Sequence, residues 1–355
     1  MAQMMQAMSS MSVEQREQML AQLPEAQRRQ MQTAQMAMMD MQHLSEQLKP
    51  SAEAPDTPVS TFAVIKGLAT CPSMKQIDDV TPGDTKVIVE TVDKLEEALG
   101  GAGALDAEAR RVCAELTRPH RRNVALLYWQ MYQSKLEGEL KLDNITERQQ
   151  QICNQIGTGI LVKAQMLLVQ NRWVQATLAI ARASALISCC LWSHSDEQCI
   201  KQMTSVLESD GLPFPKLRLE AACSPKDKPG EKEVLGDGVI KLDVVLHRDH
   251  ASEKAVKPSI ADSPLNPQGI LEAYWCYAEG VKPEASTPNS LIGAQPMVVK
   301  ALDEPFASLE LSFRAPPTPG TYPIKVHVIS TSVIGVDLTA DTTFTVVEDD
   351  LPPLE

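Results

Sequence analysis

Apolar and polar residues alternate along the second half of the chain with a period of two, which is the spacing of β-strands. In one such stretch Ile324, Val326 and Val328 fall on the same face, and in the next Phe344 and Val346 alternate with threonines. The alternating stretches cover residues 216–221, 239–246, 272–277, 295–301, 308–313, 324–328 and 343–346. Turn-forming residues separate them, so the pattern predicts about seven short strands.

This number and spacing of strands predict an antiparallel β-sandwich over residues 213–347, of the immunoglobulin or fibronectin-III type. Residues 252–268 are rich in proline and serine, and we expect them to form an insertion between two strands. Trp275 lies in one of the strands. Because a buried tryptophan often centres such a sandwich, we expect Trp275 in its core.

Between residues 105 and 203 the spacing of apolar residues changes to three and four, which is typical of amphipathic helices and predicts three or four of them, whereas residues 61–103 give a mixed signal. Val124, Leu127 and Met131 illustrate this spacing. A further helix is predicted over residues 85–99, where a Gly-Gly pair ends it. The region is therefore expected to be a set of packed helices.

Two proline-rich stretches divide the chain. Residues 50–60, PSAEAPDTPVS, predict a linker, and Leu-Pro-Phe-Pro at residues 212–215 marks the change from helix to strand spacing. We predict an α+β multidomain fold, in which a helical domain at residues 61–212 precedes the immunoglobulin- or fibronectin-III-like β-sandwich at residues 213–347. Residues 348–355 form a short acidic tail.

Residues 1–49 differ in composition, because they hold 11 of the 16 methionines, many glutamines and no glycine. The spacing predicts two amphipathic helices on either side of Pro24. The first carries Met4, Met8 and Met11 on one face, and the second carries Met31, Met38 and Met41. A flexible methionine face fits an apolar partner helix, and the alternative is a partly disordered leader that docks weakly.

Composition disfavours several classes of function. The formal net charge of -13 disfavours a nucleic-acid backbone as the partner. The eight cysteines contain no CxxC pair, so we expect reduced, buried thiols and neither disulfides nor zinc. The most apolar window, residues 176–192, is interrupted by Arg182, so we predict no membrane-spanning helix. Because the sequence contains no phosphate-binding loop, catalytic serine motif or dinucleotide fingerprint, we predict no enzyme and no cofactor.

One cluster has the residue types of a site. His247, Arg248, Asp249 and His250 place two imidazoles and a carboxylate within four residues at the end of a predicted strand. Neighbouring side chains of a strand point in opposite directions and no third metal ligand is suitably spaced, so a metal centre is disfavoured. A solvated loop and a polar contact to a protein partner remain, and these residues are the candidate protein-interaction site.

The final hairpin carries the most specific motif of the chain. Gly320 and Tyr322 lead into its first strand, and the sequence STSVIGVD, from Ser330 to Asp337, connects the two strands. We expect this motif to be structural. Gly335 would supply a backbone angle that residues with side chains adopt poorly, and Asp337 would accept hydrogen bonds from loop N–H groups.

This hairpin resembles the end of the Sec-sixty-three domain, found in the J-protein subunit of the endoplasmic-reticulum protein-translocation complex. Residues 118–129, RPHRRNVALLYW, resemble a helix of that family, and residues 149–192 resemble the two helices after it. Residues 270–277 resemble its Trp-rich strand, and residues 311–320 the segment that follows. The resemblance covers roughly residues 60–347 and implies a helical region followed by a sandwich.

In that family the sandwich contacts cytosolic loops of the Sec channel, and the helical part scaffolds it. The resemblance thus implies a non-enzymatic module of post-translational translocation, binding Sec channel subunits and other translocon membrane proteins at the cytosolic face of the endoplasmic reticulum. The implied contact loops are residues 223–238 and 247–255. The family's His-Pro-Asp tripeptide is not matched, since Pro119-His120 is followed by Arg121, and its transmembrane helices are not matched either. A split subunit and a soluble paralogue both remain open.

Two other functions are compatible with parts of the chain. The same helical and sandwich module occurs in spliceosomal RNA helicases, so an accessory role in such an assembly is one alternative, although the acidic charge opposes direct RNA binding. A methionine-rich co-chaperone is the other, and it depends on residues 1–49 alone.

Overall fold

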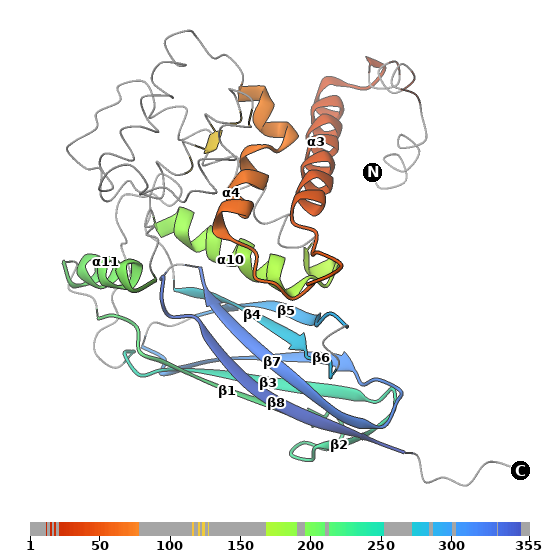
Figure 1. Cartoon of the computed structure of the whole chain (residues 1–355), viewed down its shortest axis with the longest axis vertical. Helices are drawn as coiled ribbons and strands as arrows, with labels where there is room; N and C mark the ends of the chain where they lie inside the picture. Colours follow the sequence, from red (N-terminus) through yellow and green to blue (C-terminus); the bar gives the residue numbers. More distant parts are fainter. Residues whose placement is uncertain are drawn as a thin grey trace, which may run out of the picture.

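In the computed structural model, helices precede two packed β-sheets (Figure 1). The structure describes residues 21–77, 168–189, 196–209, 213–251, 272–283, 287–299, 303–331 and 333–348, with isolated residues at 12, 15, 18, 116, 120, 123, 124 and 127. The helix predicted over residues 85–99, the insertion at 252–268, the first methionine face and residues 349–355 lie outside the described residues.

The described helices are α3 (Glu25–Gln47), α4 (Thr61–Ala69), the 3-10 helix η1 (Pro72–Ile77), α10 (Val174–Cys189) and α11 (Asp196–Ser209). The start of α4 is capped, because the Ser60 hydroxyl accepts a hydrogen bond from the N–H of Ala63 at 3.2 Å. None of the helices in the described part of the chain is long and apolar enough to cross a membrane.

Helix α3 is part of the helical core. It packs against α4 and η1, and it buries Leu44, which is followed at the helix end by the equally buried Leu48. Residues 25–48 therefore share a core with the helices after the linker, which differs from the separate leader expected from composition. The predicted helix after Pro24 is present and carries Met31, Met38 and Met41, of which Met31 is buried and Met38 is exposed.

The strands are β1 (Leu217–Pro225), β2 (Glu233–Leu235), β3 (Val239–Arg248), β4 (Ala273–Gly280), β5 (Ser290–Val298), β6 (Phe306–Arg314), β7 (Gly320–Ser330) and β8 (Leu338–Val347). One sheet has the order β1-β3-β6 and the other β2-β8-β7-β4-β5. All pairs are antiparallel except β2 with β8. Each predicted alternating stretch overlaps a strand, and the short β2 was not predicted.

The inward side chains of the two sheets form one apolar core, so the second half of the chain is a β-sandwich. Leu242 and Val244 of β3 meet Val326 of β7 in this core, and all three are fully buried. Tyr274 and Phe344 supply its largest rings.

Trp275 lies on the opposite side of its sheet. Because neighbouring side chains of a strand point to opposite faces, the inward position of Tyr274 turns Trp275 to the outer face of the five-stranded sheet. There it stacks on Tyr277, with ring centroids 5.9 Å apart, and packs against a cluster that includes Val174 and Leu178 of α10. The prediction of Trp275 in the sandwich core is therefore wrong by one strand position.

Two helices attach the helical part to the sandwich. Helix α10 lies over the outer face of the five-stranded sheet and touches α4 on its other side (Figure 1). Helix α11 lies at one end of the sandwich, where Met203 and Leu207 join the sandwich core beside Val333 and Val336.

Two leucines of the sandwich test which side chains lie in its core and which lie on its surface. We expect Leu242→Ala to lower the free energy of unfolding by about 2–5 kcal/mol, because it leaves a cavity in the core. The control is Leu235→Ala in β2, whose side chain is 48% exposed, and its effect should stay within about 0.5 kcal/mol. Urea unfolding of both variants checks this, and equal losses would contradict the proposed core.

Candidate functional site

A network of buried polar residues lies at one end of the sandwich. Arg248 is the last residue of β3 and points inward, as Leu246 does. Its side chain is almost fully buried. Glu272, the residue before β4, faces it and is also buried. Charges at this depth are stable only when they are paired and hydrogen-bonded.

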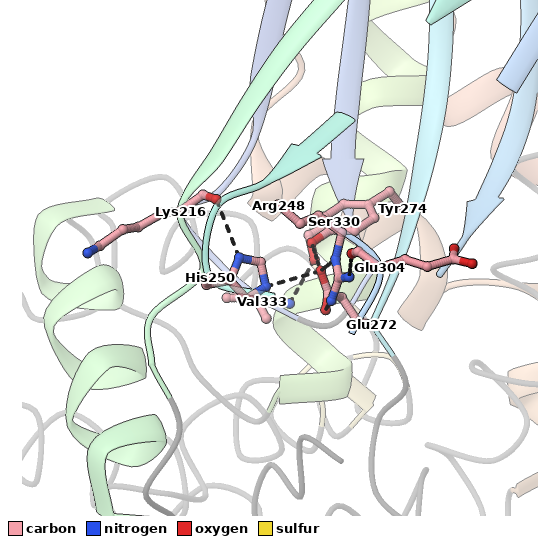
Figure 2. Close-up of polar contacts among 8 residues, drawn as sticks. All are labelled: Lys216, Arg248, His250, Glu272, Tyr274, Glu304, Ser330 and Val333. Carbon is pink, nitrogen blue, oxygen red and sulfur yellow. Dashed lines mark hydrogen bonds and ion pairs between the residues drawn. The ribbon is translucent and has the colours of Figure 1, made fainter. Parts of the chain in front are cut away.

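The guanidinium of Arg248 and the carboxylate of Glu272 form a bidentate ion pair (Figure 2). Nε of Arg248 donates to Oε1 of Glu272 at 2.8 Å, and Nη2 donates to Oε2 at 2.5 Å. Nη1 donates to the carbonyl oxygen of Glu304 at 2.5 Å, and the Tyr274 hydroxyl donates to Oε1 of Glu272 at 2.6 Å. Nε2 of His250 lies 3.5 Å from the same Oε1. The network thus joins β3, β4 and the segment before β6.

The network sets the protonation of its members. Burial by itself would raise the pKa of Glu272, but hydrogen bonds from His250, Arg248 and Tyr274 outweigh it and lower that pKa to about 2. Burial raises the pKa of Tyr274 well above its ordinary value, and the adjacent carboxylate raises it further. At neutral pH the carboxylate is therefore ionised and the phenol protonated. Both groups serve the ion pair, and neither is placed as a general acid or base.

The structure separates the four residues of the candidate interaction site. Arg248 and His250 are buried, and Nδ1 of His250 lies 3.3 Å from the carbonyl oxygen of Lys216 (Figure 2). This corrects the expectation of a solvated loop or a partner contact for these two residues. His247 and Asp249 point outward and are partly exposed. The described residues contain no group of three or more metal-ligating side chains.

The 330–337 loop, which connects β7 and β8, contains the glycine singled out in the sequence. Gly335 has φ of +87°, a left-handed conformation that residues with side chains adopt poorly. A Cβ atom at this position would lie 2.2 Å from Cγ1 of Ile200 in α11. Gly335 is therefore needed for its backbone angle and for close contact with a helix.

Asp337 connects this loop to two places. Its Oδ1 accepts a hydrogen bond from the N–H of Ser330 at 3.4 Å, and its Oδ2 accepts one from Nε of Arg182 in α10 at 3.1 Å. The Ser330 hydroxyl in turn accepts the N–H of Val333 at 2.9 Å (Figure 2). The loop motif therefore acts structurally here, and its partner α10 was not part of the prediction.

Gly320 and Tyr322 form the turn into β7. Gly320 has φ of +152° and is the first residue of the strand. The Tyr322 hydroxyl donates to the carbonyl oxygen of Thr318 at 2.7 Å, and its ring stacks on Phe344 with centroids 5.5 Å apart. A tyrosine that bonds back to the preceding turn in this way fixes the entry of a sandwich strand.

A second buried pair lies under the linker. Nε2 of His327 is 2.6 Å from Oε2 of Glu279, and the Asn289 side chain donates to Oε1 of Glu279 at 2.6 Å. The backbone N–H of Asn289 donates to the carboxylate of Asp56 at 3.2 Å. Burial would raise the pKa of Glu279, but the hydrogen bonds from His327 and Asn289 lower it. The predicted linker is therefore bonded to the sandwich.

Sequence reasoning missed Glu272 and Tyr274 as members of a site, and it missed the contacts of Arg182 and Ile200 with the final loop. One signal was available in β3, because Arg248 continues the inward series of every second residue that forms the core. The helix contacts had no such signal, since they join segments more than a hundred residues apart.

Neither a family model nor a curated protein matches this sequence. Among solved structures, a CARDB domain from Pyrococcus furiosus in complex with di-metal ions is similar at 15% identity, with a TM-score of 0.23, over 38% of this chain and 90% of that chain. The alkylpurine DNA glycosylase AlkC of Pseudomonas fluorescens is similar at 12% identity, with a TM-score of 0.22, over 87% of this chain and 97% of that chain. A family 123 glycoside hydrolase from Clostridium perfringens, at 10% identity and a TM-score of 0.22, matches 38% of this chain and 28% of its own. Similarity at TM-scores this low supports no conclusion about function.

The buried ion pair predicts a pH-dependent stability. Because the pKa of Glu272 is lowered from 4.5 to about 2, the carboxylate stabilises the fold above pH 4.5, and this contribution is lost as the pH falls toward 2. Glu272→Ala leaves Arg248 buried without its partner, so we expect a loss of about 3–5 kcal/mol at pH 7. In urea unfolding, the free energy of unfolding that Glu272→Ala loses relative to the wild type should become smaller by about 2 kcal/mol from pH 5 to pH 3.

Two further variants control this experiment. Glu310→Ala removes an exposed partner of Lys241, and it should change stability by less than about 1 kcal/mol. The double variant Arg248→Met/Glu272→Leu removes both buried charges, so it should be more stable than Glu272→Ala. A loss in Glu272→Ala that is the same at every pH would contradict the assigned role of the carboxylate.

Proposed function

We propose that this chain is a non-enzymatic interaction module of the Sec protein-translocation machinery, which binds basic cytosolic loops of the channel. The resemblance of the final hairpin to the Sec-sixty-three domain supports this. A non-enzymatic role is also supported by the buried polar network, because Arg248 and Glu272 bond to one another and to neighbouring protein groups. The module would work at the cytosolic face of the endoplasmic reticulum, attached through its partners.

The strand order favours a fibronectin-III-like sandwich. Strands β1-β3-β6 and β8-β7-β4-β5 correspond to A-B-E and G-F-C-C′ of such domains, with the short β2 added at one edge. Strand β5 pairs with β4, whereas in a constant-type immunoglobulin domain the corresponding strand would pair with β6. The Tyr322 hydroxyl bond at the start of β7 also suits this class.

The observation that carries the proposed binding is a row of side chains across the three-stranded sheet. Arg218, His247 and Phe306 are direct neighbours on adjacent strands and point to the outer face. Phe306 is 53% exposed, although it is a large apolar side chain. Figure 1 shows α3, α4 and α10 on the other side of the sandwich, over the five-stranded sheet. An exposed aromatic ring beside an arginine is typical of residues that dominate protein interfaces.

The net charge of the chain favours a basic partner. The outward residues of the three-stranded sheet include the carboxylates Glu220, Asp243, Asp249 and Glu310 and the fixed cations Arg218, Lys241 and Arg314. Lys216, which is exposed opposite Asp249, makes the carboxylates and the fixed cations of this face equal in number, so the acidic balance comes from the chain as a whole, which carries -13. A basic loop with one apolar side chain would therefore be attracted to the acidic chain and would place that side chain against Phe306.

Phe306→Ser tests this surface. In affinity purification from detergent-solubilised membranes, we expect the variant to recover at least about tenfold less channel, because an aromatic anchor is lost. Leu235→Ser is the matched control, since Leu235 is 48% exposed on β2, and it should recover channel as the wild type does. Recovery should also fall as salt rises from about 50 to 500 mM, because salt screens the carboxylates.

The results of this purification distinguish a wrong binding surface from a wrong function. Equal recovery of channel by both variants would discard the Phe306 surface and keep the function. Recovery of spliceosomal helicase proteins without any channel subunit would reject the function and favour the first alternative.

A further inference from the structure

We infer that the 330–337 loop is a rigid joint that makes α10, α11 and the sandwich open and move as one body. The loop touches all three, as its individual contacts show. These contacts all lie within the chain, so the joint does not depend on the Sec partner.

The loop contacts α11 through the backbone of Gly335, which has no side chain. Gly335 places its backbone against Ile200, where a Cβ atom would lie 2.2 Å from Cγ1 and 2.9 Å from Cδ1. Beside it, Val333 and Val336 are buried in the same cluster as Met203 of α11. Interlocked contacts of this kind have one close-packed arrangement, so the helix cannot slide without losing them.

The contact with α10 is polar. Arg182 is the one exposed residue among residues 174–187 of α10, and its Nε donates to Oδ2 of Asp337 at 3.1 Å. The other oxygen of that carboxylate accepts the N–H of Ser330 within the loop. Asp337 therefore fixes the shape of the loop and its position against α10 at the same time.

The loop is also fastened to the sandwich. The N–H and the hydroxyl of Thr331 both donate to the carbonyl oxygen of Ala273, each at 3.0 Å. Ala273 lies between Glu272 and Tyr274 of the buried network. A loop held by its neighbours on all these sides has little freedom to bend, so opening of either helix requires breaking contacts with the sandwich.

Hydrogen exchange measured by mass spectrometry tests the joint. In the wild type we expect the amides of α10, α11 and β7 to exchange with similar protection, because one opening event exposes them all. Gly335→Ala should speed exchange in α11 and α10 by at least about tenfold and leave β1, β3 and β6 unchanged, since its Cβ displaces Ile200.

Gly230→Ala is the matched control. Gly230 has φ of +90°, close to that of Gly335, and a Cβ there would meet nothing within 4 Å. This variant introduces the same backbone strain without a collision, so the exchange of α10 and α11 should stay at the wild-type rate. The effect of Gly335→Ala should also be smaller when Ile200→Ala is present, because the smaller side chain makes room.

A milder pair of variants covers the case in which Gly335→Ala does not fold. Asp337→Asn weakens the bond to Arg182 and keeps an acceptor for Ser330, so exchange should rise mainly in α10. Asp249→Asn weakens the comparable Arg218 pair within the sandwich and should leave α10 unchanged. Equal acceleration of every amide in both Gly335→Ala and Asp337→Asn would overturn the inference. So would a wild type in which α10 and α11 already exchange far faster than β7.

Discussion

The arrangement of this protein depends on covering helix α10 on two sides. Its sequence, VQATLAIARASALISC, has a single charge, and nearly all of its described side chains are buried. A helix that is apolar around its whole circumference is stable only inside a protein. Contact with α4 covers one side, and the outer face of the five-stranded sheet covers the other. The helical part and the sandwich are therefore parts of one packed structure.

This requirement explains why the two outer faces of the sandwich differ. The face under α10 carries Trp275, Tyr277 and Ile329, which bury apolar area against the helix. The face of the three-stranded sheet carries mostly charged and small polar residues, with Phe306 as its exposed aromatic. One sheet thus contributes its outer face to the fold, and the other retains a face that can contact a partner.

Two buried polar pairs lie beside the apolar core of the sandwich. Arg248 with Glu272 joins the end of β3 to the residue before β4, and Glu279 with His327 joins β4 to β7. Such pairs contribute little net stability compared with apolar residues of the same size, but breaking one is costly. A shift of β3 by one residue would leave Arg248 without Glu272, so this pair disfavours a wrong register.

The sequence alone determined the strands, because alternation with a period of two is a local property, and it identified Gly335 from the glycine-containing loop of the final hairpin. It could not determine which face of β4 turns inward. Trp275 and Tyr274 are neighbours of similar character, and only packing between the sheets selects Tyr274. The tertiary structure likewise decided that Arg248 is buried, because its partner carboxylate, Glu272, lies 24 residues further along the chain. It also decided that α10 and α11 meet the 330–337 loop, because long-range contacts depend on how elements pack and leave no periodic signal in the chain.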